Sequence, residues 1–168
     1  MTDLSSLLSE AGKKSGLLWI DVPDGRTWPA WHVWLDGTAY VVSGPGEQSL
    51  PWLPAEVALT FRGKGTGGRL VKVSASAVIV KPEDESWEAA TTALKASRLN
   101  APAGDTIARW ATDNTVYALT PRDEALEGPG SYSQESGVAQ PAPTPATTLS
   151  WHPWHIKGRP KWRRGTRR

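Results

Sequence analysis

The segment WPAWHVWLDGTAYVVSGPGEQ, residues 28–48, combines residue types that suit the binding of a flat, anionic ligand. Trp28, Trp31 and Trp34 fall within seven residues, and an indole face can stack on an aromatic ring system. The loop that follows, residues 43–48, has glycines two positions apart, which leaves backbone N–H groups free to point at an anion. The segment predicts a site in which Trp31 or Trp34 forms an aromatic wall beside this loop.

The same tryptophans also suit a protein core or a subunit interface, where tryptophan is enriched. In a strand, alternate side chains point to opposite faces, which groups Trp28, His32 and Trp34 on one face and Trp31, Val33 and Leu35 on the other. A small barrel has few interior places for so many large side chains. We therefore predict a homodimer that buries part of this strand, and the ligand and interface interpretations are compatible with each other.

Other kinds of site are poorly supported by the sequence. The chain has no cysteine, which excludes disulfides and thiolate metal sites. No Ser-His-Asp arrangement, phosphate-binding Gly-x-x-x-x-Gly-Lys motif or metal-ligand spacing surrounds His32. His152 and His155 are separated by Pro153, and two imidazoles alone do not make a zinc site. We predict no metal site, and the catalytic residues stay unknown.

The elements that must position the candidate site are mostly strands. Asp36-Gly37 supplies the two positive-φ residues of a tight hairpin turn. RLVKVSASAVIV, residues 69–80, alternates apolar and polar residues over a length that a curved barrel strand requires. Expected strands cover residues 16–22, 28–35, 38–43, 57–62, 69–80 and 115–121, and expected helices cover 3–11 and 83–98, the latter packing through Trp87 and Leu94. This order predicts a mainly β fold, a small antiparallel barrel with flanking helices.

RLVKVSASAVIV followed by KPEDESWEAATTAL, together with the hairpin AWHVWLDGTAYVVSG, resembles the pyridoxamine 5′-phosphate oxidase-like, flavin-binding split β-barrel family over about residues 10–121. The resemblance implies an antiparallel split β-barrel and a ligand site across a dimer interface. It also implies FMN as the cofactor, with a deazaflavin or haem as alternatives. Ser43 matches the family's phosphate-binding Ser or Thr, and Arg69 matches the Arg before the long strand.

Two functional hypotheses follow from this resemblance. In the first, the chain is a flavin-type oxidoreductase or cofactor-binding split barrel, with a site lined by Trp31, Trp34, Ser43, Gln48, Arg62 and Arg69. In the second, it is a non-catalytic dimeric scaffold that binds no cofactor and docks a partner. Glu47 and Gln48 stand where the family has a cation, which favours the second hypothesis, whereas the loop and the tryptophans favour the first.

The distribution of charge along the chain divides it into parts. Residues 151–168 hold seven basic and no acidic residues, whereas residues 1–150 hold 12 basic and 17 acidic ones. We predict a split-barrel domain at 1–123, a flexible Pro/Ala/Ser/Thr-rich linker at 124–150 and a basic, Trp-rich tail at 151–168. The tail is expected to dock a polyanion or an acidic protein partner, through Trp151, Trp154, Lys157, Arg159, Lys161, Trp162, Arg163 and Arg164.

The sequence contains no apolar run near the roughly 20 residues that a membrane-spanning helix needs. Its first residues lack the basic and apolar regions of a signal peptide. The expected location is therefore the cytoplasm.

Overall fold

The computed structural model describes residues 3–23, 25–65, 67–99 and 104–134, all within the first of two units, Met1–Glu135. The expected linker from residue 135 onward and the whole basic tail lie outside the described residues. Within the described part, the strands are β1 (Leu18–Asp21), β2 (Thr27–Ala30), β3 (Val33–Leu35), β4 (Thr38–Ser43), β5 (Glu56–Arg62), β6 (Arg69–Val80) and β7 (Thr115–Glu127). The helices are α1 (Leu4–Lys14), α2 (Trp87–Ser97) and α3 (Thr106–Asp113).

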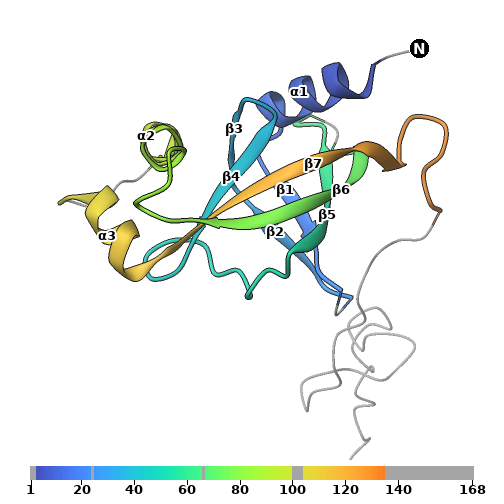
Figure 1. The fold of residues 1–168 in the computed structure, drawn as a ribbon. Helices are drawn as coiled ribbons and strands as arrows, with labels where there is room; N and C mark the ends of the chain where they lie inside the picture. Colours follow the sequence, from blue (N-terminus) through green and yellow to red (C-terminus); the bar gives the residue numbers. More distant parts are fainter. Residues whose placement is uncertain (1–2, 24, 66, 100–103, 135–168) are drawn as a thin grey trace, which may run out of the picture. The chain divides into compact units, whose positions relative to one another are not determined.

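The strands form one antiparallel sheet in the order β2-β1-β5-β6-β7-β4-β3. Its two edge strands, β2 and β3, are consecutive in the chain and are separated only by Trp31 and His32. The sheet therefore curls until its edges meet at this junction, as Figure 1 shows. The predicted mainly β, antiparallel split barrel with flanking helices is confirmed.

The β3–β4 hairpin turns at the predicted dipeptide. Leu35 pairs with Thr38, and the turn residues Asp36 and Gly37 have φ angles of 45° and 82°. Both values lie in the left-handed region that this turn requires, which glycine and aspartate tolerate better than most residues. The hairpin delivers the end of β4, at Ser43, to the glycine-containing loop.

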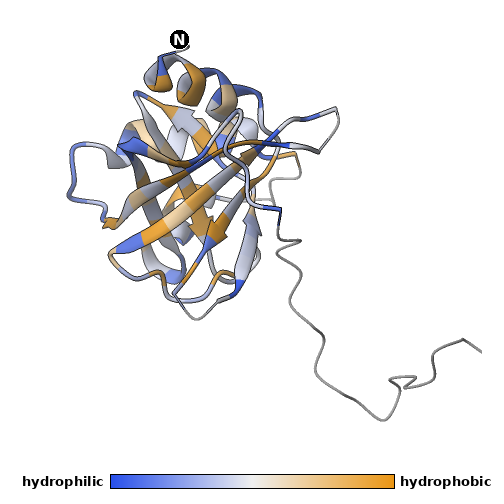
Figure 2. Cartoon of the chain, turned by 90° about the vertical axis from the view of Figure 1, so that its right-hand side faces the viewer, coloured by the Kyte–Doolittle hydropathy of each residue, from blue (hydrophilic) through white to orange (hydrophobic). Residues whose placement is uncertain are grey.

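The main core fills the inside of the curled sheet, and α1 covers one end of it (Figure 1). Apolar and polar segments alternate along the strands in Figure 2, because successive side chains point to opposite faces. On β6 the inward residues Val71, Val73 and Ala75 are fully buried. From α1, Leu8 and Ala11 are buried against this core.

A second, smaller core lies between the sheet and the helices α2 and α3. Val42, Val80 and Val116 come from three adjacent strands, and Leu94 and Trp110 come from the two helices. Leu94 is buried and Trp87 is partly buried, so α2 packs through the two residues that the sequence indicated. The alternation predicted for the tryptophan strand also holds, since Trp28 and Trp34 pack on the inner core and Trp31 on the outer one.

The structure differs from the sequence-based expectation in four elements. The expected strand 28–35 is two strands, β2 and β3, at opposite edges of the sheet, because the chain leaves one edge and joins the other at Trp31 and His32. Helix α2 begins at Trp87 rather than 83, because the segment after Lys81 forms turns held by Asp84, whose carboxylate accepts from the Lys81 N–H at 2.8 Å. Helix α3 was not expected; Asp105 caps it by accepting from the N–H groups of Ile107 and Ala108. Strand β7 continues to Glu127, six residues beyond the expected end at 121, because it pairs with the start of β6.

Among the described residues, none of the helices has the length and apolar character needed to cross a membrane.

Candidate functional site

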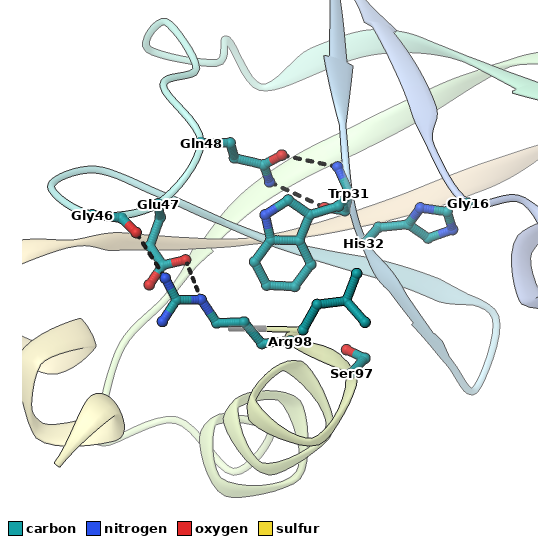
Figure 3. A pocket seen from close by; sticks show the side chains of 9 residues that line it. Gly16, Trp31, His32, Gly46, Glu47, Gln48, Ser97 and Arg98 are labelled. Carbon is teal, nitrogen blue, oxygen red and sulfur yellow. Dashed lines mark hydrogen bonds and ion pairs between the residues drawn. The ribbon is translucent and has the colours of Figure 1, made fainter. Parts of the chain in front are cut away.

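The candidate site is a hollow of about 550 Å³ at the junction where the sheet edges meet. Four separate segments wall it: the loop after α1, the β2–β3 junction, the loop after β4, and the end of α2 (Figure 3). Its lining residues are Gly16, Trp31, His32, Gly46, Glu47, Gln48, Ser97, Arg98 and Leu99. A volume of this size is typical of sites for small organic ligands.

Gln48 joins the loop to the edge of the sheet. The Trp31 N–H donates to Gln48 Oε1 at 2.8 Å, and Gln48 Nε2 donates to the Trp31 carbonyl at 3.0 Å. A carboxamide has the same donor and acceptor as a peptide group, so Gln48 takes the place of a neighbouring strand where the ladder is interrupted. These two bonds hold the Trp31 backbone in place, and the indole extends from it into the hollow (Figure 3).

Glu47 lies at the centre of a buried ion cluster. Its side chain is only 1% exposed, and Oε2 lies 3.1 Å from Arg98 Nε. Oε1 accepts from Arg109 Nη2 at 3.0 Å and from Trp110 Nε1 at 2.9 Å. One carboxylate therefore faces two guanidinium groups, and the cluster carries a net charge of +1.

The backbone of the loop after β4 adopts a shape that glycine permits and most other residues do not. Gly44 and Gly46 have φ angles of 134° and 76°, in the region that side chains with a Cβ rarely adopt. A Cβ on Gly44 would lie 2.6 Å from Nδ2 of Asn114, the residue that donates to the Pro45 carbonyl at 3.2 Å. Ser43 contributes its hydroxyl, which accepts from the Leu50 N–H at 2.9 Å.

Arg98 connects this loop to α2. Its Nη2 donates to the Gly46 carbonyl at 2.8 Å, while Nη1 is buried with no hydrogen-bond partner among the described residues. Arg109 Nε is unpartnered in the same way. Buried guanidinium N–H groups without partners are costly, and of these two arginines only Arg98 lines the hollow.

His32 stands at the other side of the Trp31 backbone from the ion cluster (Figure 3). Its Nε2 donates to the Gly12 carbonyl at 2.9 Å, and because a carbonyl only accepts, the proton of neutral His32 lies on Nε2. Burial lowers the pKa of His32, against the smaller raising effect of the Gly12 carbonyl. His32 is therefore neutral at pH 7, and its unprotonated Nδ1 is buried without a partner among the described residues.

The six residues predicted to line one site are distributed over several places. Trp31 and Gln48 line the hollow, and Ser43 lies at its edge, where it forms a parallel bridge with Gln48. Trp34 does not line it, because strand alternation turns this side chain inward, with its ring centroid 5.7 Å from that of Phe61. Arg62 and Arg69 lie elsewhere: Arg62 stacks over Trp19, and Arg69 Nη1 donates to Glu127 at 2.7 Å.

The cations of the site, Arg98 and Arg109, were missed by sequence reasoning. Arg98 follows the last turn of α2 and Arg109 lies on α3, and both are more than 50 residues from Glu47 in the chain. The signal for α3 was present, since Asp105 is a favoured N-cap and Ile107 and Trp110 recur at helical spacing. Nothing in the sequence pairs these arginines with Glu47. Among the described residues no cluster of His, Cys, Asp or Glu suits a metal ion.

No protein-family model and no curated protein sequence matches the chain. Solved structures that resemble it include HutZ, the heme storage protein from Vibrio cholerae, at 16% identity over 70% of this chain and 89% of that one, with a TM-score of 0.49. A provisionally assigned pyridoxamine 5′-phosphate oxidase from Corynebacterium glutamicum matches at 18% identity over 68% and 80%, with a TM-score of 0.44. The FAD and heme binding protein from Mycobacterium smegmatis matches at 12% identity over 94% and 95%, with a TM-score of 0.47. These low identities concern the fold alone, so a ligand has to be inferred from this chain's own residues.

Proposed function

We propose that the chain is a split-barrel cofactor-binding protein whose hollow holds a flavin-type ligand, FMN or a deazaflavin, as part of an oxidoreductase. The observation that carries this proposal is the pairing of an indole wall with a cationic edge in one hollow. Trp31 supplies a flat apolar surface for a ring system, and Arg98 supplies a positive charge and the unpartnered Nη1 group for a phosphate. The excess positive charge of the Glu47 cluster favours an anion there.

Glu47 stands where a phosphate-binding loop would be expected to have a cation, but its negative charge does not oppose a phosphate in the folded chain. A lone carboxylate in a phosphate-binding loop would repel the ligand, but this one is neutralised by two arginines and is 1% exposed. The loop has no lysine or arginine of its own, and the positive charge beside it comes from Arg98 after α2 and Arg109 on α3.

Haem fits the described residues less well than a flavin does. His32 is the only histidine among them, and both of its nitrogens are unsuited to an axial bond. Nε2 is engaged by the Gly12 carbonyl, and Nδ1 is buried. Haem ligation by Nε2 would require the loss of the bond to α1, and ligation by Nδ1 would require that buried nitrogen to become accessible.

The roles of the chain's own residues in this proposal are to bind and to orient. When bound, a flavin supplies hydride or single-electron transfer. Trp31 would stack on the ring, Arg98 would hold the anionic end, and Gln48 would keep Trp31 in position. The Glu47 carboxylate is engaged by Arg98, Arg109 and Trp110, and His32 Nε2 by the Gly12 carbonyl, so neither is assigned a role in the chemistry. A homodimer in the cytoplasm remains part of the proposal.

The test is a titration of the purified protein with FMN, followed by flavin fluorescence, after its visible absorption spectrum has shown whether a chromophore copurifies. Arg98→Gln removes a charge-assisted contact and should weaken binding about tenfold or more. Trp31→Leu should weaken binding by removing the stacking surface, whereas Trp31→Phe should retain most of it. Arg122→Gln is the matched control, because Arg122 is exposed and pairs with Glu56 on the sheet.

A protein that carries no chromophore and binds neither FMN nor a deazaflavin would overturn the cofactor hypothesis. The alternative from the sequence, a non-catalytic scaffold that acts through its basic tail, would then take its place.

A further inference from the structure

A second hollow, of about 320 Å³, lies where the loop after α1 meets the β5–β6 turn. Its walls include Leu17, Trp19, Arg62 and Lys64, together with glycine backbone from the turn. No acidic residue lines it, and it shares only Gly16 with the hollow at Trp31. Its chemistry is therefore apolar and cationic.

Arg62 is held in place in this hollow by three separate features. The pairing of β5 with β6 shifts register between Phe61 and Arg62, and such a bulge re-aims the side chain of a strand residue. The Ser15 hydroxyl donates to the Arg62 carbonyl at 2.9 Å. The guanidinium lies over the Trp19 ring, 4.9 Å from its centroid. A long, flexible side chain is thus fixed in one orientation.

The charge of Arg62 is not neutralised by the protein around it. No carboxylate among the described residues lies within ion-pair distance of Arg62 or Lys64, although Arg69 and Lys72 on the adjacent strand both have acidic partners. Arg62 Nε is buried and has no hydrogen-bond partner in the described part of the chain. Stacking on Trp19 occupies one face of the guanidinium and leaves the terminal Nη groups, rather than the buried Nε, for a planar anionic group.

The hollow also offers an apolar contact next to these cations. Leu17 is 47% exposed, so its side chain is accessible to a ligand in the hollow. Leu17 precedes Leu18, which pairs with Phe61 in β5, so continuing the register by one residue places it beside Arg62. Leu17 and Trp19 lie on the outer face of the sheet, because Leu18 and Ile20 are buried inside, and Arg62 is on the same face because it stacks on Trp19.

We propose that this hollow is a second ligand site, which binds the carboxylate or phosphate group of a small organic anion through Arg62 and Lys64 while Leu17 and Trp19 contact its apolar part. The site is separate from the flavin site proposed above and does not depend on it. Arg62 was expected to line the same site as Trp31, but the structure places it in this neighbouring hollow.

The test uses phenyl phosphate as the probe and the full chain as the protein. Binding is followed by the NMR signal of the Trp19 indole N–H, identified by its loss in Trp19→Phe. We expect a saturable shift of this signal, and tighter binding of phenyl phosphate than of inorganic phosphate or neutral benzyl alcohol. Arg62→Gln should weaken phenyl phosphate binding about tenfold or more. Lys64→Gln should weaken it severalfold, and Lys95→Gln, an exposed change on α2, should leave it unchanged.

The proposal is overturned if the Trp19 signal does not saturate, or if Arg62→Gln binds phenyl phosphate as tightly as the unchanged protein does. Should Arg62→Gln fail to fold, Lys64→Gln decides in its place, and an unchanged affinity in that variant overturns the proposal. The result is independent of FMN binding, which is read at Trp31. If the protein binds FMN but not phenyl phosphate, only the second-site proposal has failed. If it binds phenyl phosphate but not FMN, only the flavin proposal has failed.

Discussion

Glu47 shows how much the meaning of a single residue depends on its neighbours. By type it is an exposed acid in a surface loop, and by position it opposes the binding of a phosphate. In the folded chain it is almost completely buried, accepts hydrogen bonds from Arg109 and Trp110, and forms an ion pair with Arg98. The residue thus organises a cationic cluster instead of adding a negative charge to the site.

We predict that Glu47→Gln destabilises the protein by about 3 kcal/mol, because removing one partner leaves guanidinium groups buried without a counter-charge. Chemical denaturation measures this directly. Glu85→Gln, in the exposed segment before α2, is the matched control and should change the stability by less than about 0.5 kcal/mol. Equal stability of the two variants would show that the cluster does not contribute.

His32 makes the stability of the protein depend on pH, and the stability it contributes decreases as the pH falls. Its folded-state pKa is lowered by burial, so the unfolded chain takes up a proton at a higher pH than the folded one. The stability it contributes is complete above the unfolded-state pKa of about 6.5 and is lost as the pH falls through the folded-state value. One proton corresponds to a slope of at most about 1.4 kcal/mol per pH unit.

We therefore predict that His32→Gln, whose side-chain amide can still donate to the Gly12 carbonyl, reduces the loss of stability between neutral and mildly acidic pH. The free energy of unfolding measured across this range for both proteins tests the prediction. Identical pH profiles would mean that His32 titrates alike in the folded and unfolded chains.

At the scale of elements, helix α1 and strand β3 make an unusually close approach. A Cβ on Gly12 of α1 would lie 2.3 Å from ring carbons of Trp34, a distance that real Cβ contacts do not show. Trp34 in turn packs edge-on to Phe61, with an interplanar angle of 83°. The glycine allows the helix to lie directly on the indole and to offer its carbonyl to His32.

We predict that Gly12→Ala destabilises the protein by about 1–3 kcal/mol through overpacking. The direction of the change in stability is informative, because alanine is favoured over glycine in a helix by about 1 kcal/mol when nothing else changes. Helix propensity alone would therefore make Gly12→Ala stabilising. Thermal unfolding of Gly12→Ala is compared with that of Gly65→Ala, where a Cβ would meet nothing within 4 Å. A stabilised Gly12→Ala variant would contradict the close approach.

At the scale of the whole molecule, the charge is divided between two parts of the chain. Residues 151–168 carry +7 and residues 1–150 carry −5 at neutral pH, so the tail and the remainder attract different partners. The tail lies outside the described residues, and its role as a docking segment for a polyanion stays a prediction.

We predict that the full chain binds heparin or duplex DNA, with log affinity that falls steeply as log salt rises, and that truncation after Ser150 abolishes this binding. The truncated protein should keep its melting temperature, since residues 3–134 already contain both apolar cores. A lower melting temperature without polyanion binding by the full chain would assign the tail's tryptophans to packing instead.

Local patterns in the sequence determined most of the strands and two of the three helices. The Asp36-Gly37 turn, the 12-residue alternation of β6 and the two faces of the tryptophan strand depend on neighbouring residues, so each could be predicted without knowing the fold. Helix α3 was missed, although its cap Asp105 indicated it, because it is only eight residues long and holds little more than two turns of apolar spacing. The strand alternation even indicated that Trp31 and Trp34 point to opposite sides.

Only the tertiary structure decided which of these residues share a site. Glu47 contacts Arg98 and Arg109 because α2 and α3 pack beside the loop after β4. Residues so far apart in the chain are not linked by any spacing pattern in the sequence, so these ion pairs could not be predicted from it. Arg62 was separated from Trp31 by the order of the strands, because β1 lies between β5, which holds Arg62, and β2, which leads to Trp31. Composition and spacing predict what an element is, whereas the pairing and packing of distant elements determine what its side chains can hold together.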